Sequence, residues 1–459
     1  MTDKASRREF LKRSAALGIT GAAAPFALNL AAMGEAAAAT ASDYKALVCI
    51  FLFGGCDHAN TLTPYDQPTY DLYARARPGL AYARDSLLPT VLNPDVALPN
   101  GRQYALAPAL SPLNDVFNAG DLAVMLNTGT LIEPTTKAQY QAQSVRLPPK
   151  LFSHNDQQSF WQSSSPEGAT SGWGGRIGDL FQSGNGSAAL TCVNVSGNAV
   201  LLSGRSTVQY AVSSTGPILL NSGGQTLYGS AAATNALKLL MGGAHANLFE
   251  NEHARVAKRS IDLATSLDSA LTAAAPIATP FPNTTLANQL RMVARLIAIS
   301  GDASIAARRQ VFFVSMGGFD LHDTLATRQP VLLDQVATAM RAFYDASIEL
   351  GIADKVTAFT ASDFGRTLVP NNDGSDHAWG SSHFVMGSAV RGKAFYGRAP
   401  SFALGSSDDV GQGRFVPAIS VDQYASTLAS WFGVGNGDMA TVLPDIGNYD
   451  ASTWNLGFV

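Results

Sequence analysis

The sequence is poor in charge and in cysteine. Charged residues make up 14% of the 459 residues and the formal net charge is −4, so a broad basic surface for nucleic acid is not expected. The three cysteines, Cys49, Cys56 and Cys192, are too few for a disulfide framework. No C-x-x-C, no C-x-x-C-H and no G-x-G-x-x-G opening a helix occurs, which argues against a redox protein. After residue 40 no run of 18 apolar residues appears, so no further membrane span is expected.

Hydrophobic residues are plentiful, at 46%, alongside 42 Gly and 22 Pro. This composition supports a large buried core and excludes a mostly disordered chain, a collagen-like repeat and a coiled coil. The length fits either two or three domains or one large α/β domain with insertions.

The first 40 residues have the composition of an export signal. They begin with Ser6-Arg7-Arg8-Glu9-Phe10-Leu11-Lys12, continue with an Ala/Gly/Leu-rich stretch over 14–33, and end in small residues that offer cleavage sites. The pattern S-R-R-x-F-L-K resembles a twin-arginine signal. The alternative is an uncleaved anchor, although the small residues and Pro25 make the stretch only weakly apolar. We therefore expect residues 41–459 to act in the periplasm or outside the cell, with no stable membrane span after cleavage.

Short apolar runs alternate with amphipathic segments along the remaining chain. Runs of the kind found in strands buried on both faces occur at 46–53, 122–126, 190–195, 311–316 and 355–361. One predicted helix starts after Asn283 or Thr284 and stops at Gly301, and another spans 330–350. This order predicts a doubly wound α/β fold, with a mostly parallel sheet covered by helices on both faces.

Residues 200–280 have a different composition and are interpreted as an insertion or cap in the 41–459 domain. They are rich in Ser, Gly and Thr, with short strands expected at 208–212 and 218–220. A long helix is expected over 244–273.

Five of the seven histidines fall in four short motifs that also carry aspartates. The motifs are GGCDHAN at 54–60, SHND at 153–156, GGFDLH at 317–322, and SDFGR at 362–366 continuing through SDH at 375–377 to His383. Three of them follow apolar runs, and ligands of open α/β sheets bind at the carboxyl ends of the strands. Carboxylates and imidazoles together suit Zn²⁺ or Mn²⁺, with Mg²⁺ or Ca²⁺ as the alternatives at the oxygen-rich part. Taken singly, each motif is also explained by a tight turn, a helix cap or a structural salt bridge.

Taken together, the motifs resemble those of a known family. GGCDHANT, SHND, GGFDLH, SDFGRT and SDHAWGSSHF, with Trp173-Gly174-Gly175-Arg176 and Ser420-Val421-Asp422-Gln423-Tyr424, are similar to the motifs of the DUF1501 family of exported bacterial proteins. The likeness covers essentially all of 41–459. That family is grouped with the alkaline phosphatase-like superfamily, which includes sulfatases. The resemblance implies a metal-bearing α/β core that acts on phosphate or sulfate esters.

The resemblance also implies roles for individual residues. One or two ions would be held by Asp57, Asp320, His322, Asp363, Asp376, His377 and His383. Ser153 would be the nucleophile, with Ser159 and Thr130 as competitors. His154 would donate a proton or orient Ser153, and Arg366 would bind a substrate oxygen or pair with a metal-ligand Asp.

Two departures from the superfamily pattern favour a second hypothesis. Asp320 and His322 are separated by one residue, where three or more are common, and Phe364 stands where many members place a histidine. The chain could therefore be a catalytically inactive metal-binding scaffold or maturation protein with a protein partner. As an enzyme it would hydrolyse esters of a small molecule or a polymer.

Overall fold

A ten-stranded sheet forms the centre of the computed structural model, which describes residues 43–219, 226–243 and 247–459. The predicted export signal therefore lies outside the described residues. The strand order is β13-β4-β12-β9-β1-β8-β5-β6-β7, and β14 pairs with β4. The strands are β1 (Lys45–Leu52), β4 (Leu122–Gly129), β5 (Cys192–Asn194), β6 (Tyr210–Ser213), β7 (Gly216–Pro217), β8 (Arg309–Met316), β9 (Val356–Ser362), β12 (Ser381–Met386), β13 (Ala394–Tyr396) and β14 (Ile419–Ser420).

Most strand pairs in this sheet are parallel. β1 pairs in parallel with β8 and β9, β5 with β6 and β8, and β4 with β13 and β14. β12 runs antiparallel to β4 and β9, and β7 antiparallel to β6. All five predicted strands are present, so the predicted α/β class with a mostly parallel sheet is confirmed.

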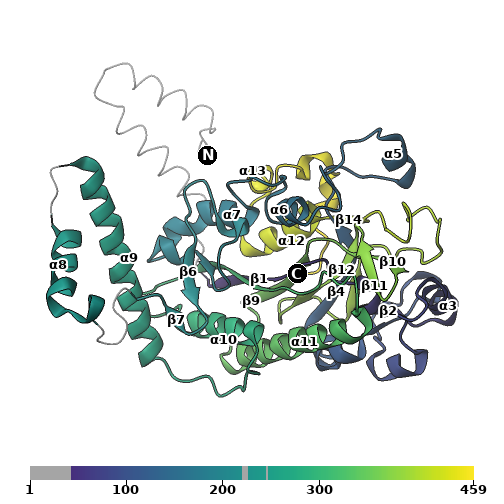
Figure 1. Cartoon of the computed structure of the whole chain (residues 1–459), viewed down its shortest axis with the longest axis horizontal. Helices are drawn as coiled ribbons and strands as arrows, with labels where there is room; N and C mark the ends of the chain where they lie inside the picture. Colours follow the sequence, from purple (N-terminus) through teal and green to yellow (C-terminus); the bar gives the residue numbers. More distant parts are fainter. Residues whose placement is uncertain (1–42, 220–225, 244–246) are drawn as a thin grey trace, which may run out of the picture.

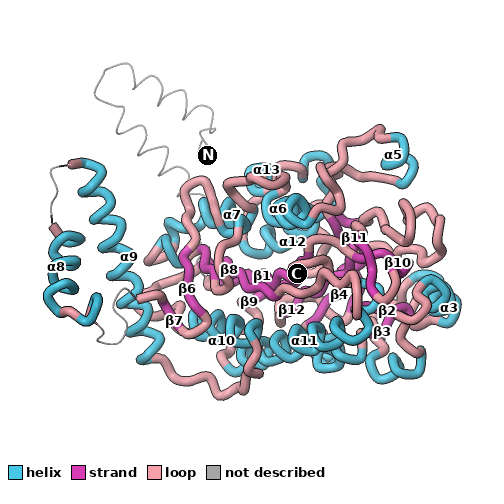
Figure 2. The backbone as a smooth tube through the Cα atoms, in the orientation of Figure 1, coloured by secondary structure: helices cyan, strands magenta, loops and turns pink. Residues whose placement is uncertain are grey.

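Helices cover both faces of the sheet (Figures 1 and 2). Alternate residues of β1 point into two separate cores: Val48 and Ile50 pack on one face, and Leu47 and Phe51 on the other. This explains why β1 is an unbroken apolar run rather than an alternating one. One core lies against α10 (Thr285–Ala298) and α11 (Leu325–Glu349), and the other against α6 (His154–Ser163), α7 (Trp173–Phe181), α12 (Val421–Phe432) and α13 (Met439–Val442).

The remaining elements lie around this layered body. Two small hairpins are formed by β2 (Leu62–Pro64) with β3 (Tyr104–Leu106) and by β10 (Arg366–Asn371) with β11 (Gly374–His377). The other α-helices are α3 (Gln67–Ala76), α4 (Asn114–Ala119), α5 (Lys137–Ala142), α8 (Ala231–Gly242) and α9 (Leu248–Ala273). Short 3-10 helices include one over His58–Asn60. In the described part of the chain, no helix has the length and apolar character needed to cross a membrane.

Two helix predictions needed correction. α11 begins at Leu325, five residues before the predicted start at Pro330, which lies inside the helix. The reason is tertiary: backbone N–H groups of Thr324 and Leu325 donate to the side chain and carbonyl of Asp373, each at 3.0 Å, and this fixes the first turn. The sequence prediction also missed α8, which is capped by the Ser230 side chain.

Residues 200–280 lie at one end of the sheet. β6 and β7 extend its edge, and α8 and α9 project beyond it as a helical hairpin (Figure 1). The expected strand at 218–220 is replaced by β7 at 216–217, and residue 220 lies outside the described residues.

The carboxyl ends of β1, β8 and β9 meet at one rim of the sheet. Leu52 is level with Met316 on one side and Ser362 on the other. The loops that follow are closely packed: Gly54 has a φ of +114°, and a Cβ there would lie 2.3 Å from the backbone nitrogen of Asp320. Only glycine fits this position, which brings the motif after β1 against the motif after β8.

Behind this rim, the first turn of α12 contains a buried carboxyl group. Asp422 is 1% exposed, and its carboxylate oxygens accept from Ser164 Oγ at 2.6 Å and from the backbone N–H of Asp445 at 3.1 Å. Burial raises the pKa of Asp422 to about 7. The group therefore holds a proton in the folded protein under conditions where the unfolded chain has lost it.

We expect Asp422→Asn to flatten the pH dependence of stability. Between the unfolded pKa of about 3.9 and the folded value, only the folded state binds the proton, so the free energy of unfolding of the wild type falls as pH rises. As pH rises from 5 to 7.5, the free energy of unfolding of the variant should therefore gain about 2 kcal/mol relative to that of wild type. Thermal unfolding at both pH values measures the effect, with the exposed Asp334→Asn as control. Parallel pH profiles for Asp422→Asn and wild type would contradict it.

Candidate metal centre

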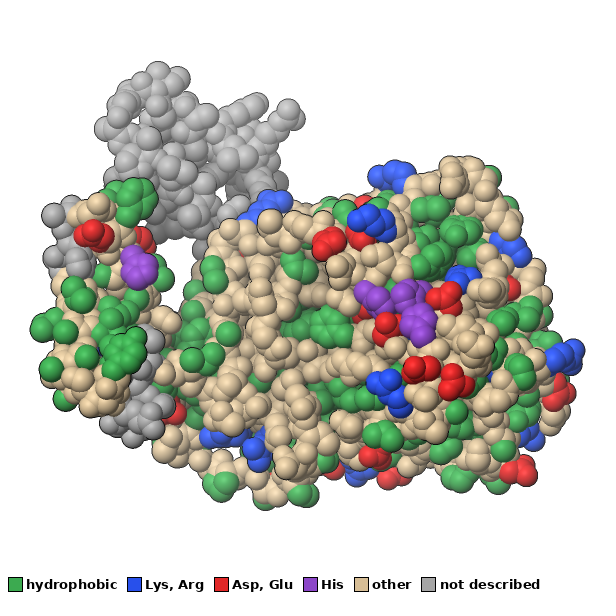
Figure 3. All heavy atoms as spheres, viewed as in Figure 1, with side chains coloured by type: hydrophobic (Ala, Val, Ile, Leu, Met, Phe, Trp, Pro, Cys, Tyr) green, Lys and Arg blue, Asp and Glu red, His purple; other side chains and the backbone are tan. Residues whose placement is uncertain are grey.

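Three imidazoles converge on Asp320 at the strand-end rim. Nε2 of His322 lies 2.9 Å from Oδ1 of Asp320, and Nε2 of His377 lies 3.3 Å from the same oxygen. Nε2 of His154 lies 3.4 Å from Oδ2. The Nε2 atoms of His322 and His377 are 3.0 Å apart. Figure 3 shows histidine and acidic side chains gathered in one patch on this face of the molecule.

Asp363 sets the orientation of His154. Nδ1 of His154 lies 2.7 Å from Oδ2 of Asp363, and because a carboxylate only accepts, Nδ1 carries the proton. In the neutral imidazole the lone pair is then on Nε2. That atom is buried and has no hydrogen-bond partner among the described residues. Asp363 is held by two more donors, the backbone N–H of Gly54 at 3.2 Å and Nε2 of Gln158 at 2.7 Å.

His377 is oriented by a backbone carbonyl. Its Nδ1 donates to the carbonyl oxygen of Phe152 at 2.7 Å, which leaves the Nε2 lone pair directed to Asp320. Phe152 has a φ of +81°, in the left-handed region that bulky side chains rarely adopt. The backbone immediately before α6 is thus strained in the conformation that presents this carbonyl.

His322 has an amide beside its other nitrogen. Nδ2 of Asn371 lies 3.1 Å from Nδ1 of His322, and Oδ1 of Asn371 is buried without a partner among the described residues. Exchanging the amide oxygen and nitrogen would let Oδ1 accept from Nδ1–H and free the Nε2 lone pair of His322.

Arg366 ties the loops of the rim together. Its buried guanidinium donates to the Asp320 carboxylate and to carbonyl oxygens from two loops and strand β11; the carbonyls are those of Gly54, Gly55, Phe319 and Ser375. These acceptors engage its N–H groups within the protein. Of the two roles expected for Arg366, the ion pair with Asp320 is present in the structure. Binding of a substrate oxygen stays a prediction.

The charges of the group follow from these contacts. Burial opposes ionisation of Asp320, but the hydrogen bond and charge of Arg366 outweigh it and lower the pKa of that carboxyl group. The hydrogen bond to Asp363 raises the pKa of His154, and burial lowers the pKa of His377. In the neutral form of both imidazoles, their Nε2 lone pairs face the Asp320 carboxylate, which is an excess of acceptors that a cation would satisfy.

The donor set fits a zinc-like ion. Ligand atoms of His154, Asp320 and His377 lie within 4.8 Å of one another, as do those of His322, Asp376 and His377. Donor atoms around a tetrahedral ion with bonds of 2.0–2.1 Å are about 3.3 Å apart. The 2.9–3.4 Å contacts to Asp320 are close to that spacing. Asp376 also accepts from Arg414 Nη2 at 2.8 Å, so it is a more peripheral candidate.

The structure does not bring Asp57 and His383 into this group. The Asp57 carboxylate forms a buried ion pair with Arg77, whose Nη1 also donates to the carbonyls of Thr367 and Leu368. His383 is 2% exposed on β12, with its ring 4.7 Å from that of Trp161 and 6.3 Å from that of Tyr424. Both predicted ligands thus lie outside the histidine group: the Asp57 carboxylate has its own counter-charge, and the His383 imidazole faces aromatic rings.

Ser153, the proposed nucleophile of the sequence analysis, lies directly before a helix. It is the N-cap residue of α6, and its hydroxyl donates to Oδ2 of Asp156 at 2.8 Å. Its two neighbours in the chain, Phe152 and His154, both contact the histidine group or its supports. The competing hydroxyls are bound elsewhere: Thr130 donates to Gln157 and Ser159 to the carbonyl of Pro166.

Sequence reasoning missed three supports of this site: Arg77, Gln158 and the carbonyl of Phe152. Gln158 lies four residues after His154, the spacing that places two side chains on one face of a helix, so this spacing was a usable signal. The partners of Arg77 and Phe152 come from tertiary packing, for which the sequence holds no local signal.

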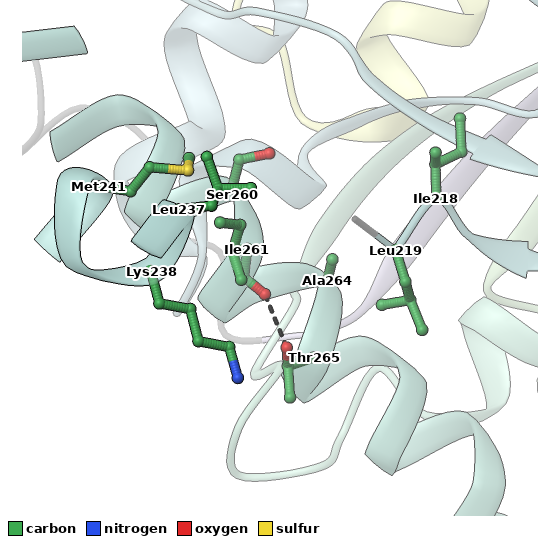
Figure 4. A pocket seen from close by; sticks show the side chains of 9 residues that line it. All are labelled: Ile218, Leu219, Leu237, Lys238, Met241, Ser260, Ile261, Ala264 and Thr265. Carbon is green, nitrogen blue, oxygen red and sulfur yellow. Dashed lines mark hydrogen bonds between the residues drawn. The ribbon is translucent and has the colours of Figure 1, made fainter. Parts of the chain in front are cut away.

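A separate pocket lies where α8 and α9 meet residues 218–219 (Figure 4). Its cavity of about 260 Å³ is lined by Ile218, Leu219, Leu237, Lys238, Met241, Ser260, Ile261, Ala264 and Thr265. Lys238 is the one ionisable side chain of this lining, so the pocket offers no set of metal ligands.

Fold and site together define an α/β protein with a His- and Asp-rich centre at the carboxyl ends of its strands. The chain belongs to the family described as "Protein of unknown function (DUF1501)", whose profile matches residues 44–414. The predicted membership is confirmed. No curated protein matches the sequence.

Several solved structures show weak similarity. The lipoteichoic acid synthase LtaP from Listeria monocytogenes is 9% identical with a TM-score of 0.35, over 90% of this chain and 77% of that one. The PsFucS1 sulfatase from Pseudoalteromonas sp. is 7% identical with a TM-score of 0.31, over 90% and 75%. The C-terminal periplasmic domain of EcEptC from Escherichia coli, solved in complex with Zn, is 10% identical with a TM-score of 0.28, over 76% and 74%. Similarities of this size carry no argument about activity.

We expect Asp57→Asn to destabilise the protein without changing its metal content. The substitution leaves the Arg77 guanidinium, which is fully buried, without its counter-charge, at a cost of about 3–5 kcal/mol. The double variant Asp57→Leu with Arg77→Met should recover most of this loss, because it removes both charges. Chemical unfolding and elemental analysis of both variants test the expectation. A fully folded Asp57→Asn variant that has lost its bound metal would contradict the expectation.

Proposed function

We propose that this protein is a metal-dependent hydrolase of phosphate or sulfate esters. The observation that carries the proposal is the convergence of His154, Asp320, His322 and His377, with the buried Nε2 of His154 lacking a protein partner. The order of the motifs along the chain, similar to that of the alkaline phosphatase-like superfamily, supports the same reaction class. The S-R-R-x-F-L-K signal supports a place of action in the periplasm or outside the cell.

These four residues would hold one divalent ion, with Zn²⁺ or Mn²⁺ favoured by the imidazole-rich set and Mg²⁺ or Ca²⁺ less suited. The ion would polarise an ester oxygen and lower the pKa of a hydroxyl or water. A ligand role suits His154 better than proton donation, because its Nδ1 is bound to Asp363 and its Nε2 faces Asp320. A second ion would need Asp57 and Asp363, and both carboxylates are already bound by protein donors.

Ser153 is the proposed nucleophile. Its hydroxyl lies 2.8 Å from a carboxylate oxygen of Asp156, which could accept the proton as the hydroxyl attacks phosphorus or sulfur. The leaving alcohol would depart from the opposite side, and water would release the ester formed on Ser153. Lys150, whose Nζ lies 3.5 Å from the same Asp156 carboxylate, balances its charge.

The second candidate is a metal-binding protein without catalytic activity that supports a protein partner. Two observations favour it: Arg366 is engaged within the protein, and Asp57 is paired with Arg77. A substrate phosphate or sulfate group would therefore find fewer positively charged partners than in a two-ion site.

We expect His377→Ala and His154→Ala each to lose most of the bound metal. Wild type should carry about one ion per chain, and each variant well below that, because each loses a ligand. Elemental analysis of the purified full chain measures this, with the exposed His253→Ala as matched control. Metal-replete wild type should hydrolyse an aryl phosphate or aryl sulfate.

Ser153→Ala should keep its metal and lose turnover by about 100-fold or more, as expected of a nucleophile. Turnover equal to that of wild type would show that Ser153 is not the nucleophile. Bound metal in wild type with no ester turnover would favour the non-catalytic candidate.

A further inference from the structure

One face of α6 presents two side chains to the same carboxylate oxygen. Nδ1 of His154 and Nε2 of Gln158 each lie 2.7 Å from Oδ2 of Asp363. The two residues are four positions apart, one turn of the helix, so both reach the same point. The Asp363 side chain has no exposed surface, and its other oxygen accepts from the backbone N–H of Gly54.

A buried carboxylate with this set of donors has little freedom to rotate. Burying a charge is costly unless it is hydrogen-bonded, so each donor both stabilises Asp363 and fixes its direction. The backbone of Gly54 fixes Oδ1 from the strand β1 side, and Gln158 fixes Oδ2 from α6.

We propose that Gln158 is a positioning residue of the metal centre. By donating to Asp363, it holds the carboxylate where it accepts from Nδ1 of His154, and thereby keeps Nε2 of His154 directed to Asp320. The inference rests on the proposed function, since it takes His154 as a ligand. Partners of this kind set the tautomer and ring orientation of a ligating histidine, and their loss typically weakens metal binding 10–100-fold.

The test uses the full chain with Zn²⁺ and Co²⁺ as probes. Gln158→Met keeps the length of the side chain and removes the donor, and Gln158→Leu removes it with a side chain of a different shape. Gln162→Met is the matched control on α6, since its amide bonds only to backbone groups. Competition with a chromophoric chelator gives the Zn²⁺ affinity, and the visible absorption of bound Co²⁺ reports its coordination.

We expect both Gln158 variants to bind Zn²⁺ about 10–100-fold more weakly and to shift the Co²⁺ spectrum, with Gln162→Met unchanged in both. In a His154→Ala background, Gln158→Met should cause no further loss, because its effect passes through His154. Wild-type Zn²⁺ affinity in the folded Gln158 variants, or an equal loss without His154, would overturn the positioning role alone. A wild type that binds neither ion would overturn the proposed metal centre itself.

Discussion

The candidate site depends on the hydrogen bonds made by the Nδ1 atoms of its histidines. A neutral imidazole has one N–H and one lone pair, and the partner of the first decides where the second points. Asp363 holds Nδ1 of His154, and the Phe152 carbonyl holds Nδ1 of His377. Both lone pairs then face Asp320. Since Phe152 and His154 belong to one short segment, the strained turn before α6 sets two of the three imidazoles at once.

Two buried arginines tie together the segments around these histidines. Arg366 donates to carbonyl oxygens in the loops after β1 and β8 and to that of Ser375 in β11. Arg77 pairs with Asp57 and donates to the carbonyl oxygen of Thr367 in β10. A guanidinium can do this because its planar fork offers five donors in fixed directions. Both charges are balanced by aspartates. The rim therefore keeps its shape through internal ion pairs, and a bound cation would add to an arrangement that the protein already holds.

The sequence could predict which strands form the centre of the sheet and that their carboxyl ends carry the site. Buried parallel strands are long apolar runs, and this pattern is local, so β1, β4, β8 and β9 were predicted close to their true bounds. Which of the aspartates lie in the candidate metal centre does not depend on local sequence. In the sequence, each of the three aspartates at 57, 320 and 363 follows a strand in the same way. Only tertiary packing pairs Asp57 with Arg77 and lets Gln158 donate to Asp363. The start of α11 was missed for the same reason, since Asp373 fixes it from a distant turn.

The exposure of the group bears on the substrate it could admit. The side chains of Asp320 and His322 are 46% and 42% exposed, whereas that of Asp363 is fully buried. Asp320 and His322 thus lie at the surface, and Asp363, which orients His154, lies beneath. Under the proposed function, a site of this form would leave most of an ester outside the protein, so a long polymer would fit as well as a small molecule. Selectivity would then come from the surface around the histidines, because the interior is occupied by the hydrogen bonds that hold them.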